Sequence, residues 1–395
     1  MEIVSKKPLF IRLAKPTYGR FILWRHRITA EGMDKLSDLK PPFIVVANHV
    51  HTLDPFFISS ASPVHIRWVA GAYLFRLFGL RPLLQRWVGA ISKVQNKSDM
   101  HTIRMIGAAL KSGDIVGLFP EGTRTWDGEP VGFDSALAKL LRLFKVPVVV
   151  LSLEGLYAER PRWAKVARKG PSTLRWVTTI DVDTIASLSD QQLYKRLKET
   201  LGFSFTKWQA EHQIPFVSKR GAEGAEQVLY LCPDCKSIGT IQTEARTIAC
   251  NHCSMKMHLD EFERLHLLDG ENPHSDIASW HAWERSYIAN HADQLTFPLD
   301  RGVLFQRIDQ YKMIPISMNF TLSIEEEAMI IRPQQGEPTL LPFADITSMA
   351  INARNTLELS CNGVRYRIRI QQNGSVLKYT EYAQAREERI KGGNS

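Results

Sequence analysis

Residues 43–55 read FIVVANHVHTLDP, and this stretch decides the fold of the first half of the chain. Its first five residues are apolar and largely β-branched, which predicts a short buried strand. Pro55 and the apolar residues after it predict a helix that starts with Asp54 at its N-cap. A buried strand that leads through a polar loop into a helix is typical of an α/β layer.

His49 and Asp54 lie on the loop between the predicted strand and the predicted helix. The loop is short enough for Asp54 to reach one imidazole nitrogen of His49, which leaves the other nitrogen to accept a proton. This pairing predicts a general base with an orienting carboxylate. The alternative is a surface histidine and an aspartate that only starts the helix. His51 is nearby but has no partner at the same spacing.

Residues 114–124 read DIVGLFPEGTR and repeat the arrangement of an apolar strand followed by a polar turn. Gly122 lets backbone N–H groups approach an anion, and Thr123 offers a hydroxyl. Arg124 supplies a planar guanidinium group that can donate two hydrogen bonds to one phosphate. The turn therefore predicts a phosphate-binding site at a strand end. The alternative is a plain turn with a solvated arginine. Two such sites on successive strand ends favour a functional site.

Together, NH-x4-D at residues 48–54 and FPEGTR at residues 119–124 resemble the glycerophospholipid acyltransferase family, which includes the 1-acylglycerol-3-phosphate acyltransferases. Residues 125–128 and 145–153 also resemble family elements. The resemblance implies an α/β acyltransferase domain with a mixed sheet flanked by helices. It also implies direct acyl transfer from a thioester donor to the hydroxyl of a lysophospholipid, in phospholipid biosynthesis or remodelling. The donor is either acyl-CoA or an acyl group on acyl carrier protein.

Carried over residue by residue, the resemblance makes His49 the general base and Asp54 its orienting partner. It assigns the polar head of the acceptor to the second turn and to two lysines before it: Glu121, Gly122, Thr123, Arg124, Lys93 and Lys97. The lysines replace an arginine of the family, and Asp134 replaces a lysine. The acceptor is therefore left open, between 1-acylglycerol-3-phosphate and another lysolipid. The alternative function is a lipid-binding protein on the same fold that has lost catalysis.

The segment between residues 3 and 30 has no acidic residue and alternates cations with apolar and aromatic side chains. This composition is typical of a segment in the interface of an anionic membrane, and residues 68–87 repeat it in part. The alternative for each is a helix that packs in the core. The sequence shows neither a signal peptide nor an apolar run of about 18 residues. We expect a protein at the cytoplasmic face of a membrane, peripheral or monotopic.

Two C-x2-C pairs follow, Cys232 with Cys235 and Cys250 with Cys253. Their spacing is typical of a zinc ribbon, and four thiolates leave no open position, so the zinc is expected to be structural. Two disulfides are the alternative, which a chain without a secretory signal does not favour. The net charge of +9 also allows a nucleic-acid binder built on the ribbon. No nucleic acid is expected as a partner, because the ribbon lacks a basic aromatic face.

The length of 395 residues predicts two or three domains. Residues 218–226 are small and polar and are interpreted as a linker. The expected domains are residues 1–217 with the acyltransferase motifs and the interfacial segment, residues 226–262 with the zinc ribbon, and residues 263–395.

The C-terminal part is expected to be helical over residues 260–292 and then rich in strands. The predicted strands are residues 319–323, 328–332, 346–351, 356–361 and 364–370. Asn362-Gly363 predicts a hairpin turn between the last two, and residues 376–390 predict a closing helix. Strands followed by one helix resemble a pleckstrin-homology-like α+β domain, in which Cys361 is expected to be a buried apolar residue.

Overall fold

The structure is a computed structural model that describes residues 14–76, 80–93, 100–268, 272–309, 312–325, 327–371 and 374–392. The chain divides into two compact units. Unit 1 consists of Met1–Arg162 and Arg168–Phe216, and unit 2 consists of Trp163–Ala167 and Val217–Ser395. Within the described ranges, none of the helices has both the length and the apolar character needed to cross a bilayer.

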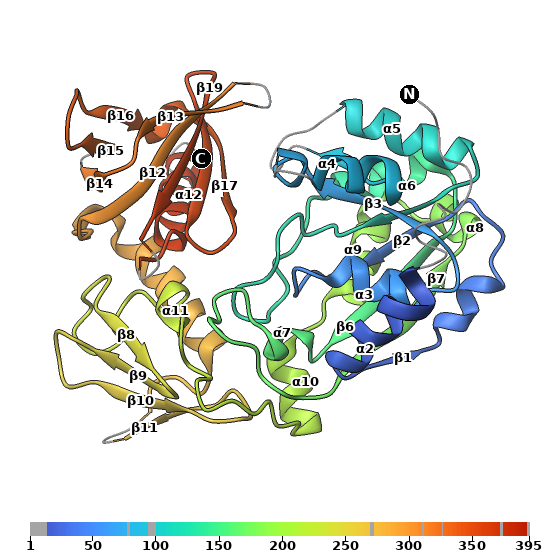
Figure 1. Ribbon diagram of the computed structural model, residues 1–395, viewed down its shortest axis with the longest axis horizontal. Helices are drawn as coiled ribbons and strands as arrows, with labels where there is room; N and C mark the ends of the chain where they lie inside the picture. Colours follow the sequence, from blue (N-terminus) through green and yellow to red (C-terminus); the bar gives the residue numbers. More distant parts are fainter. Residues whose placement is uncertain are drawn as a thin grey trace. The chain divides into compact units, whose positions relative to one another are not determined.

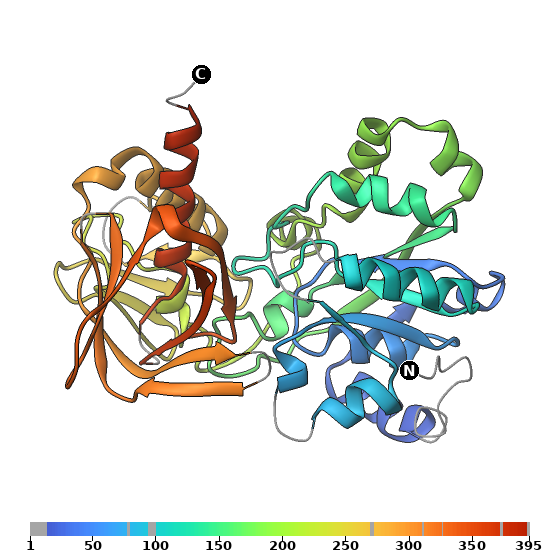
Figure 2. The ribbon, with the colours of Figure 1, turned by 90° about the horizontal axis from the view of Figure 1, so that it is seen from above.

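Unit 1 is built on a seven-stranded mixed sheet with helices on both faces (Figures 1 and 2). Its strands are β1 (Ile28–Glu31), β2 (Ile44–Ala47), β3 (Ile66–Gly71), β4 (Ile91–Lys93), β5 (Ile115–Leu118), β6 (Val148–Glu154) and β7 (Ser172–Ile180). They lie in the order β1-β7-β6-β2-β5-β3-β4. All neighbours are parallel except β6 and β7. The predicted α/β fold with a mixed sheet flanked by helices is confirmed.

The central strand β2 is apolar throughout because both of its faces are buried. Val45 and Ala47 point into one core, and Ile44 and Val46 point into the other. The first core is covered by α2 (Arg20–Arg25), α3 (Asp54–Ala61), α7 (Leu156–Glu159) and α10 (Phe205–His212). The second is covered by α5 (Met100–Lys111), α6 (Ala136–Phe144), α8 (Val182–Ser187) and α9 (Asp190–Leu201). Because β2 and β5 are parallel neighbours, their carboxyl ends lie at the same edge of the sheet.

The start of α3 differs from the prediction in one respect. The N-cap is Leu53, and Asp54 is the first residue of the helix rather than its cap. The carboxylate of Asp54 accepts hydrogen bonds from the loop before the helix, so it does not cap the amides that follow. The predicted N-cap role of Asp54 is wrong, because that loop competes successfully for the carboxylate.

Unit 2 begins with a four-stranded antiparallel sheet in the order β11-β10-β9-β8. Its strands are β8 (Ile241–Glu244), β9 (Thr247–Cys250), β10 (Lys256–Leu259) and β11 (Leu265–Leu267), and α11 (Ile277–His291) follows. The predicted helix over residues 260–292 is therefore wrong in its first half. Asp260 accepts hydrogen bonds from the N–H groups of Phe262 and Arg264, which forms a turn into β11 instead of a helix.

The rest of unit 2 is an eight-stranded antiparallel sheet with α12 (Leu377–Gly392) against it (Figure 1). The strands are β12 (Asp300–Asp309), β13 (Lys312–Ser317), β14 (Phe320–Glu325), β15 (Ala328–Pro333), β16 (Thr339–Pro342), β17 (Ile346–Asn352), β18 (Thr356–Cys361) and β19 (Val364–Ile370). All five predicted strands and the closing helix are present. Asn362 and Gly363 both have positive φ, as the predicted hairpin turn requires, and Cys361 is buried in the core.

The interpretation of residues 218–226 as a linker is wrong for most of the segment. Residues 221 and 222 and residues 224–226 are buried, and Gly224 N–H donates to Thr243 Oγ1 at 3.0 Å. Gly224 has a φ of 103°, and a Cβ there would lie 2.1 Å from the carbonyl oxygen of Trp163. The small residues serve close packing within unit 2 rather than chain flexibility.

Candidate active site

His49 and Asp54 are hydrogen-bonded on the loop that connects β2 to α3. Nδ1 of His49 lies 2.8 Å from Oδ2 of Asp54, which is fully buried. The same Oδ2 accepts the backbone N–H groups of Val50 and His51, each at 2.8 Å. The hydrogen bond to this carboxylate oxygen holds the imidazole proton on Nδ1. Nε2 is thereby left with a lone pair that can accept a proton.

The plane of the His49 ring is set by aromatic stacking. The ring lies on Phe119 with centroids 4.3 Å apart, and Phe119 lies on Trp68 at 4.8 Å. Asn48 fixes the loop from the other side, because its amide exchanges two hydrogen bonds with the backbone of Leu153 in β6. The His49 side chain keeps 20% of its surface exposed, so the fixed ring remains accessible.

The second polar turn is hydrogen-bonded to the backbone of His49. Oε2 of Glu121 accepts the N–H of His49 at 2.9 Å, and the N–H of Thr125 donates to the carbonyl of His49 at 3.1 Å. The polar loop that carries His49 and the polar turn that carries Glu121 are therefore hydrogen-bonded to each other at the ends of the adjacent strands β2 and β5. In this geometry Glu121 holds the loop of the histidine.

Arg162 is a site residue that sequence reasoning missed. Its Nη1 donates to Thr123 Oγ1 at 2.8 Å and to the carbonyl of Arg124 at 3.2 Å, and its guanidinium lies 4.4 Å from the ring centroid of Trp126. Arg162 is buried and lies 38 residues after Arg124 in the chain. No motif marks it, and only the fold brings it to the turn.

The electrostatics of the site favour a neutral His49. Burial is the largest cause that lowers the His49 pKa; Asp54 raises it, and Arg124 and Arg162 lower it. Burial also raises the pKa of Glu121 to about 7, although the N–H groups of His49 and Val131 lower it. The site thus combines a neutral base with two guanidinium groups in its surroundings, an arrangement suited to an anionic ligand.

The remaining predicted site residues have different surroundings. Gly122 is exposed with a φ of 68°, which favours glycine. Lys93 ends the edge strand β4, with β3 between β4 and β5. Lys97 lies outside the described residues. Asp134 is exposed and accepts the N–H of Ala136 at 2.7 Å, in the turn before α6.

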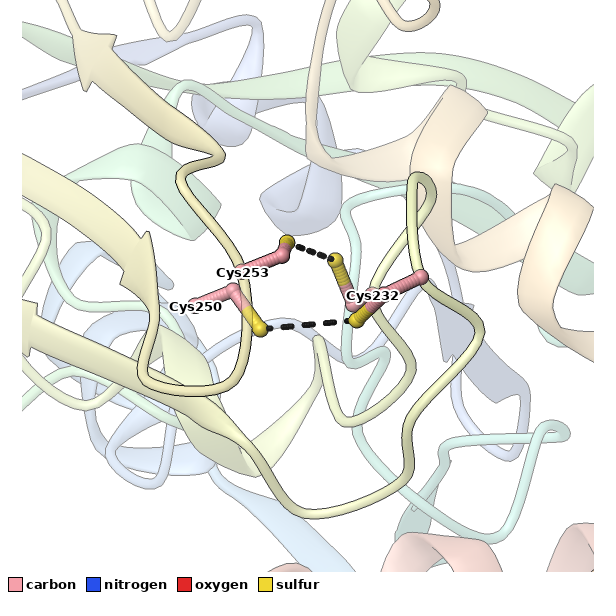
Figure 3. Close-up of side chains that lie close together, drawn as sticks. Cys232, Cys250 and Cys253 are labelled. Atoms are coloured by element: carbon pink, nitrogen blue, oxygen red, sulfur yellow. Dashed lines mark hydrogen bonds between the residues drawn. The ribbon is translucent and has the colours of Figure 1, made fainter.

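Four of the five cysteines of unit 2 form a cluster, and Figure 3 labels Cys232, Cys250 and Cys253 of it. The Sγ atoms of Cys232 and Cys253 are 3.6 Å apart, those of Cys235 and Cys250 are 3.7 Å apart, and all four lie within 4.8 Å of one another. A tetrahedral zinc site with Zn–S bonds of about 2.3 Å separates its sulfurs by about 3.8 Å. A disulfide would require about 2.05 Å, and all four cysteines are free. The donor set fits one zinc ion.

The protein around the cluster supports its shape. The N–H of His252 donates to Sγ of Cys250 at 3.4 Å. Oε1 of the buried Glu284 on α11 accepts the N–H groups of Tyr230 and Leu231, directly before the first C-x2-C pair. The first cysteine pair is therefore anchored to α11 as well as to its own turn.

Residues 27–154 match the family model described as Acyltransferase. This region contains both polar turns, so it is an acyltransferase domain. The match covers about a third of the chain and leaves residues 155–395 outside it.

A curated relative and a solved structure are similar to parts of the chain. The lyso-ornithine lipid O-acyltransferase of Rhizobium meliloti (strain 1021) is 36% identical over 91 residues, which are 23% of this chain and only 30% of that protein. The crystal structure of the 1-acyl-sn-glycerophosphate (LPA) acyltransferase from Thermotoga maritima gives a TM-score of 0.42 at 23% identity. It covers 48% of this chain and 76% of that one.

Proposed function

We propose that this protein is a membrane-associated O-acyltransferase. It moves a fatty acyl group from acyl-CoA or an acyl carrier protein to the hydroxyl of a lysophospholipid, in phospholipid biosynthesis or remodelling. The observation that carries the proposal is the His49–Asp54 pair, at 2.8 Å, on an acyltransferase domain. A lipid hydroxyl is a weak nucleophile near neutral pH and needs such a base.

The reaction follows from the position of the free nitrogen of His49. Nε2 accepts the proton of the acceptor hydroxyl while the hydroxyl oxygen attacks the thioester carbonyl. The tetrahedral intermediate then collapses, the C–S bond breaks, and the leaving thiolate takes up the proton from the imidazolium. An ester and a free thiol are formed, and no acyl-enzyme is needed. Asp54 orients the ring and stabilises its charged form.

The acceptor side is assigned to the second turn. Gly122, Thr123 and Arg124, with Lys93 and Lys97 as further cations, are proposed to hold the polar head of the lysolipid. Arg162 supports this role, because it holds the hydroxyl of Thr123 and the backbone of Arg124 in place. The acceptors to compare are 1-acylglycerol-3-phosphate and lyso-ornithine lipid, the latter suggested by the name of the curated relative.

Membrane association is proposed through the helical segment of residues 15–25, which includes α2. Tyr18, Phe21 and Trp24 are 60%, 53% and 73% exposed, and their rings form a row with centroids 6.4 and 5.9 Å apart. Exposed aromatic rings next to Arg20 and Arg25 suit the interface of an anionic leaflet, so we place the protein at the cytoplasmic face, peripheral or monotopic. Residues 3–13 of the predicted interfacial segment lie outside the described residues.

For unit 2, we propose a structural zinc ribbon over residues 226–262 and a pleckstrin-homology-like domain over residues 263–395. They follow the proposed acyltransferase domain, residues 1–217, in the sequence. The sulfur spacing of the cysteine cluster supports the first. The antiparallel sheet β12–β19 with α12 packed on it supports the second.

The test of the proposed activity is acceptor-dependent thiol release. Purified protein is incubated with acyl-CoA or acyl carrier protein and a panel of lysolipids, and thiol and diacyl product are both quantified. Equal amounts of the two, formed only when a lysolipid is present, are the expected result. Tight lysolipid binding without thiol release would instead favour the alternative, a lipid-binding protein that has lost catalysis.

A further inference from the structure

Unit 1 has a pocket beside helix α2 and strand β1, two elements that carry these labels in Figure 1. Its volume is about 750 Å³, and it shares no lining residue with the His49 site. The walls come from two segments of the chain and one residue of α7: residues 23–29, residues 168–171 and Glu159. The proposed acyl transfer leaves this pocket without a function.

The lining of the pocket is strongly cationic. Arg25, Arg27 and Lys169 are exposed, and in the part of the chain that the structure describes none of them has an ion-pair partner. Arg168 adds a fourth positive charge and donates to the carbonyl of Ala158 at 3.1 Å. Exposed cations that converge on one hollow without protein partners create a positive potential that attracts anions.

Glu159 is the one carboxyl group in the lining. It is 3% exposed, with Oε1 at 3.2 Å from Nδ1 of His26 and Oε2 at 3.5 Å from Nε2 of His51. Oε2 has no hydrogen-bond partner among the described residues. Burial raises the pKa of Glu159 to about 7, against the effect of Arg160, Arg25 and Arg168. Near neutral pH the carboxyl is therefore partly protonated, and its hydroxyl is able to donate to an anion.

The exposed aromatic residues beside the pocket indicate that the anion belongs to a lipid. Trp24 lines the pocket and is 73% exposed, and Phe21 and Tyr18 continue the exposed aromatic row from it. Aromatic rings beside cations are characteristic of surfaces that sit at the boundary between headgroups and acyl chains. A free phosphate in solution would use the cations alone and would gain nothing from the rings.

We propose that this pocket binds the phosphate group of an anionic phospholipid that is not a substrate, with Arg25, Arg27 and Lys169 around the phosphate and Trp24 among the lipids. The lipid would hold unit 1 on the bilayer while the separate His49 site acts on the acceptor.

The test uses the full chain and sedimentation with vesicles of phosphatidylcholine, with and without phosphatidic acid. Phosphatidic acid has no free hydroxyl, so it is not an acceptor of acyl groups. The double variant Arg27→Gln/Lys169→Gln is compared with Arg196→Gln/Lys198→Gln, which removes the same charge from the exposed face of α9 in the same unit. We expect the first to lose about tenfold or more of its binding to phosphatidic acid vesicles, and the second less than about twofold. Equal losses in the two would show that only net charge matters and would overturn the proposal.

Two further arms make the test specific. Glu159→Gln removes the one negative charge at constant size and should bind phosphatidic acid vesicles at least as tightly as the wild type above pH 7; weaker binding would contradict the proposal. Inorganic phosphate should not displace the protein from these vesicles at concentrations that leave the control variant bound, and displacement would assign the pocket to free phosphate. Acyl transfer to a detergent-dispersed acceptor should be unchanged in Arg27→Gln/Lys169→Gln, so failure of the pocket proposal is separable from failure of the proposed activity.

Discussion

The active-site loops of unit 1 and the cysteine cluster of unit 2 reach their geometry by different routes. Each C-x2-C pair places two sulfurs together within one turn, so the cluster needs only the joining of two local elements. The His49 site depends on Glu121, 72 residues away, and on Arg162, which holds the turn after Glu121. Local spacing is enough to predict the cysteine cluster, whereas tertiary packing makes the environment of the proposed base.

The largest expected effect comes from a substitution that disrupts the His49 site and leaves the cysteine cluster intact. Asp54→Asn keeps the size of the side chain but replaces the carboxylate with an amide, whose N–H group can donate to Nδ1 of His49 and so favours the other tautomer. We expect acyl transfer to fall by about 10²–10⁴-fold, because the ring loses its productive tautomer. The measurement is kcat/KM for thiol release. Zinc content should stay at the wild-type level, and a loss of zinc in this variant would contradict the separation of the two regions.

The second prediction concerns a substitution that disrupts the cysteine cluster and leaves the His49 site intact. Cys250→Ser removes one of four thiolates, and we expect the zinc content to fall from about one ion per chain to near zero. Residues around the cluster should become sensitive to protease, while thiol release per folded molecule stays within about twofold. The checks are metal analysis and limited proteolysis of protein purified under reducing conditions. Wild-type protein without metal under these conditions would rule out the zinc site.

The third prediction sharpens the contrast by testing the residue that no motif marks. Arg162→Gln removes the donor to Thr123 Oγ1 and to the carbonyl of Arg124. Loss of hydrogen bonds from a charged group corresponds to about a 10- to 100-fold fall in kcat/KM. Arg160→Gln, an exposed arginine two residues earlier, should leave kcat/KM with a detergent-dispersed acceptor unchanged. Equal effects of the two substitutions would remove Arg162 from the site.

The smallest expected effect concerns pH. The pKa of Glu121 is raised to about 7, and its carboxylate accepts the N–H of His49. As the pH falls through about 7, Glu121 gains a proton and the loop loses a charged acceptor, so kcat/KM should decline there. Glu121→Gln keeps a neutral acceptor at every pH. In this variant the decline should move to the pKa of His49, which burial holds below 6.5. An unchanged profile would exclude Glu121 as its cause.

The sequence predicted those parts of the fold that local patterns determine. The strands β2 and β5 are continuous apolar runs, and β18 and β19 flank an Asn-Gly turn, so each was predicted close to its observed bounds. Strands β12 and β13 were not predicted, since charged residues interrupt the first and Pro315 lies in the second. Their pairing with each other and with β19 supplies what their own sequences lack.

The candidate site was predictable to a similar extent. The spacing of His49 and Asp54 indicates their pairing, because both lie on one short loop. It does not reveal that Glu121 holds the backbone of His49, or that Arg162 reaches the second turn. Such contacts depend on how distant segments pack. For the same reason, the buried turn around Gly224 was mistaken for a linker from its composition.

The central claim is that His49 is the base for acyl transfer, and the most direct test is thiol release by His49→Ala beside His212→Ala, which removes an exposed histidine of the same unit. Both variants are assayed with the acceptor that the wild type uses best, together with thermal unfolding and vesicle binding. We predict that His49→Ala has no measurable acceptor-dependent turnover but unfolds and binds vesicles like the wild type, while His212→Ala is fully active. Wild-type turnover in His49→Ala would contradict the account.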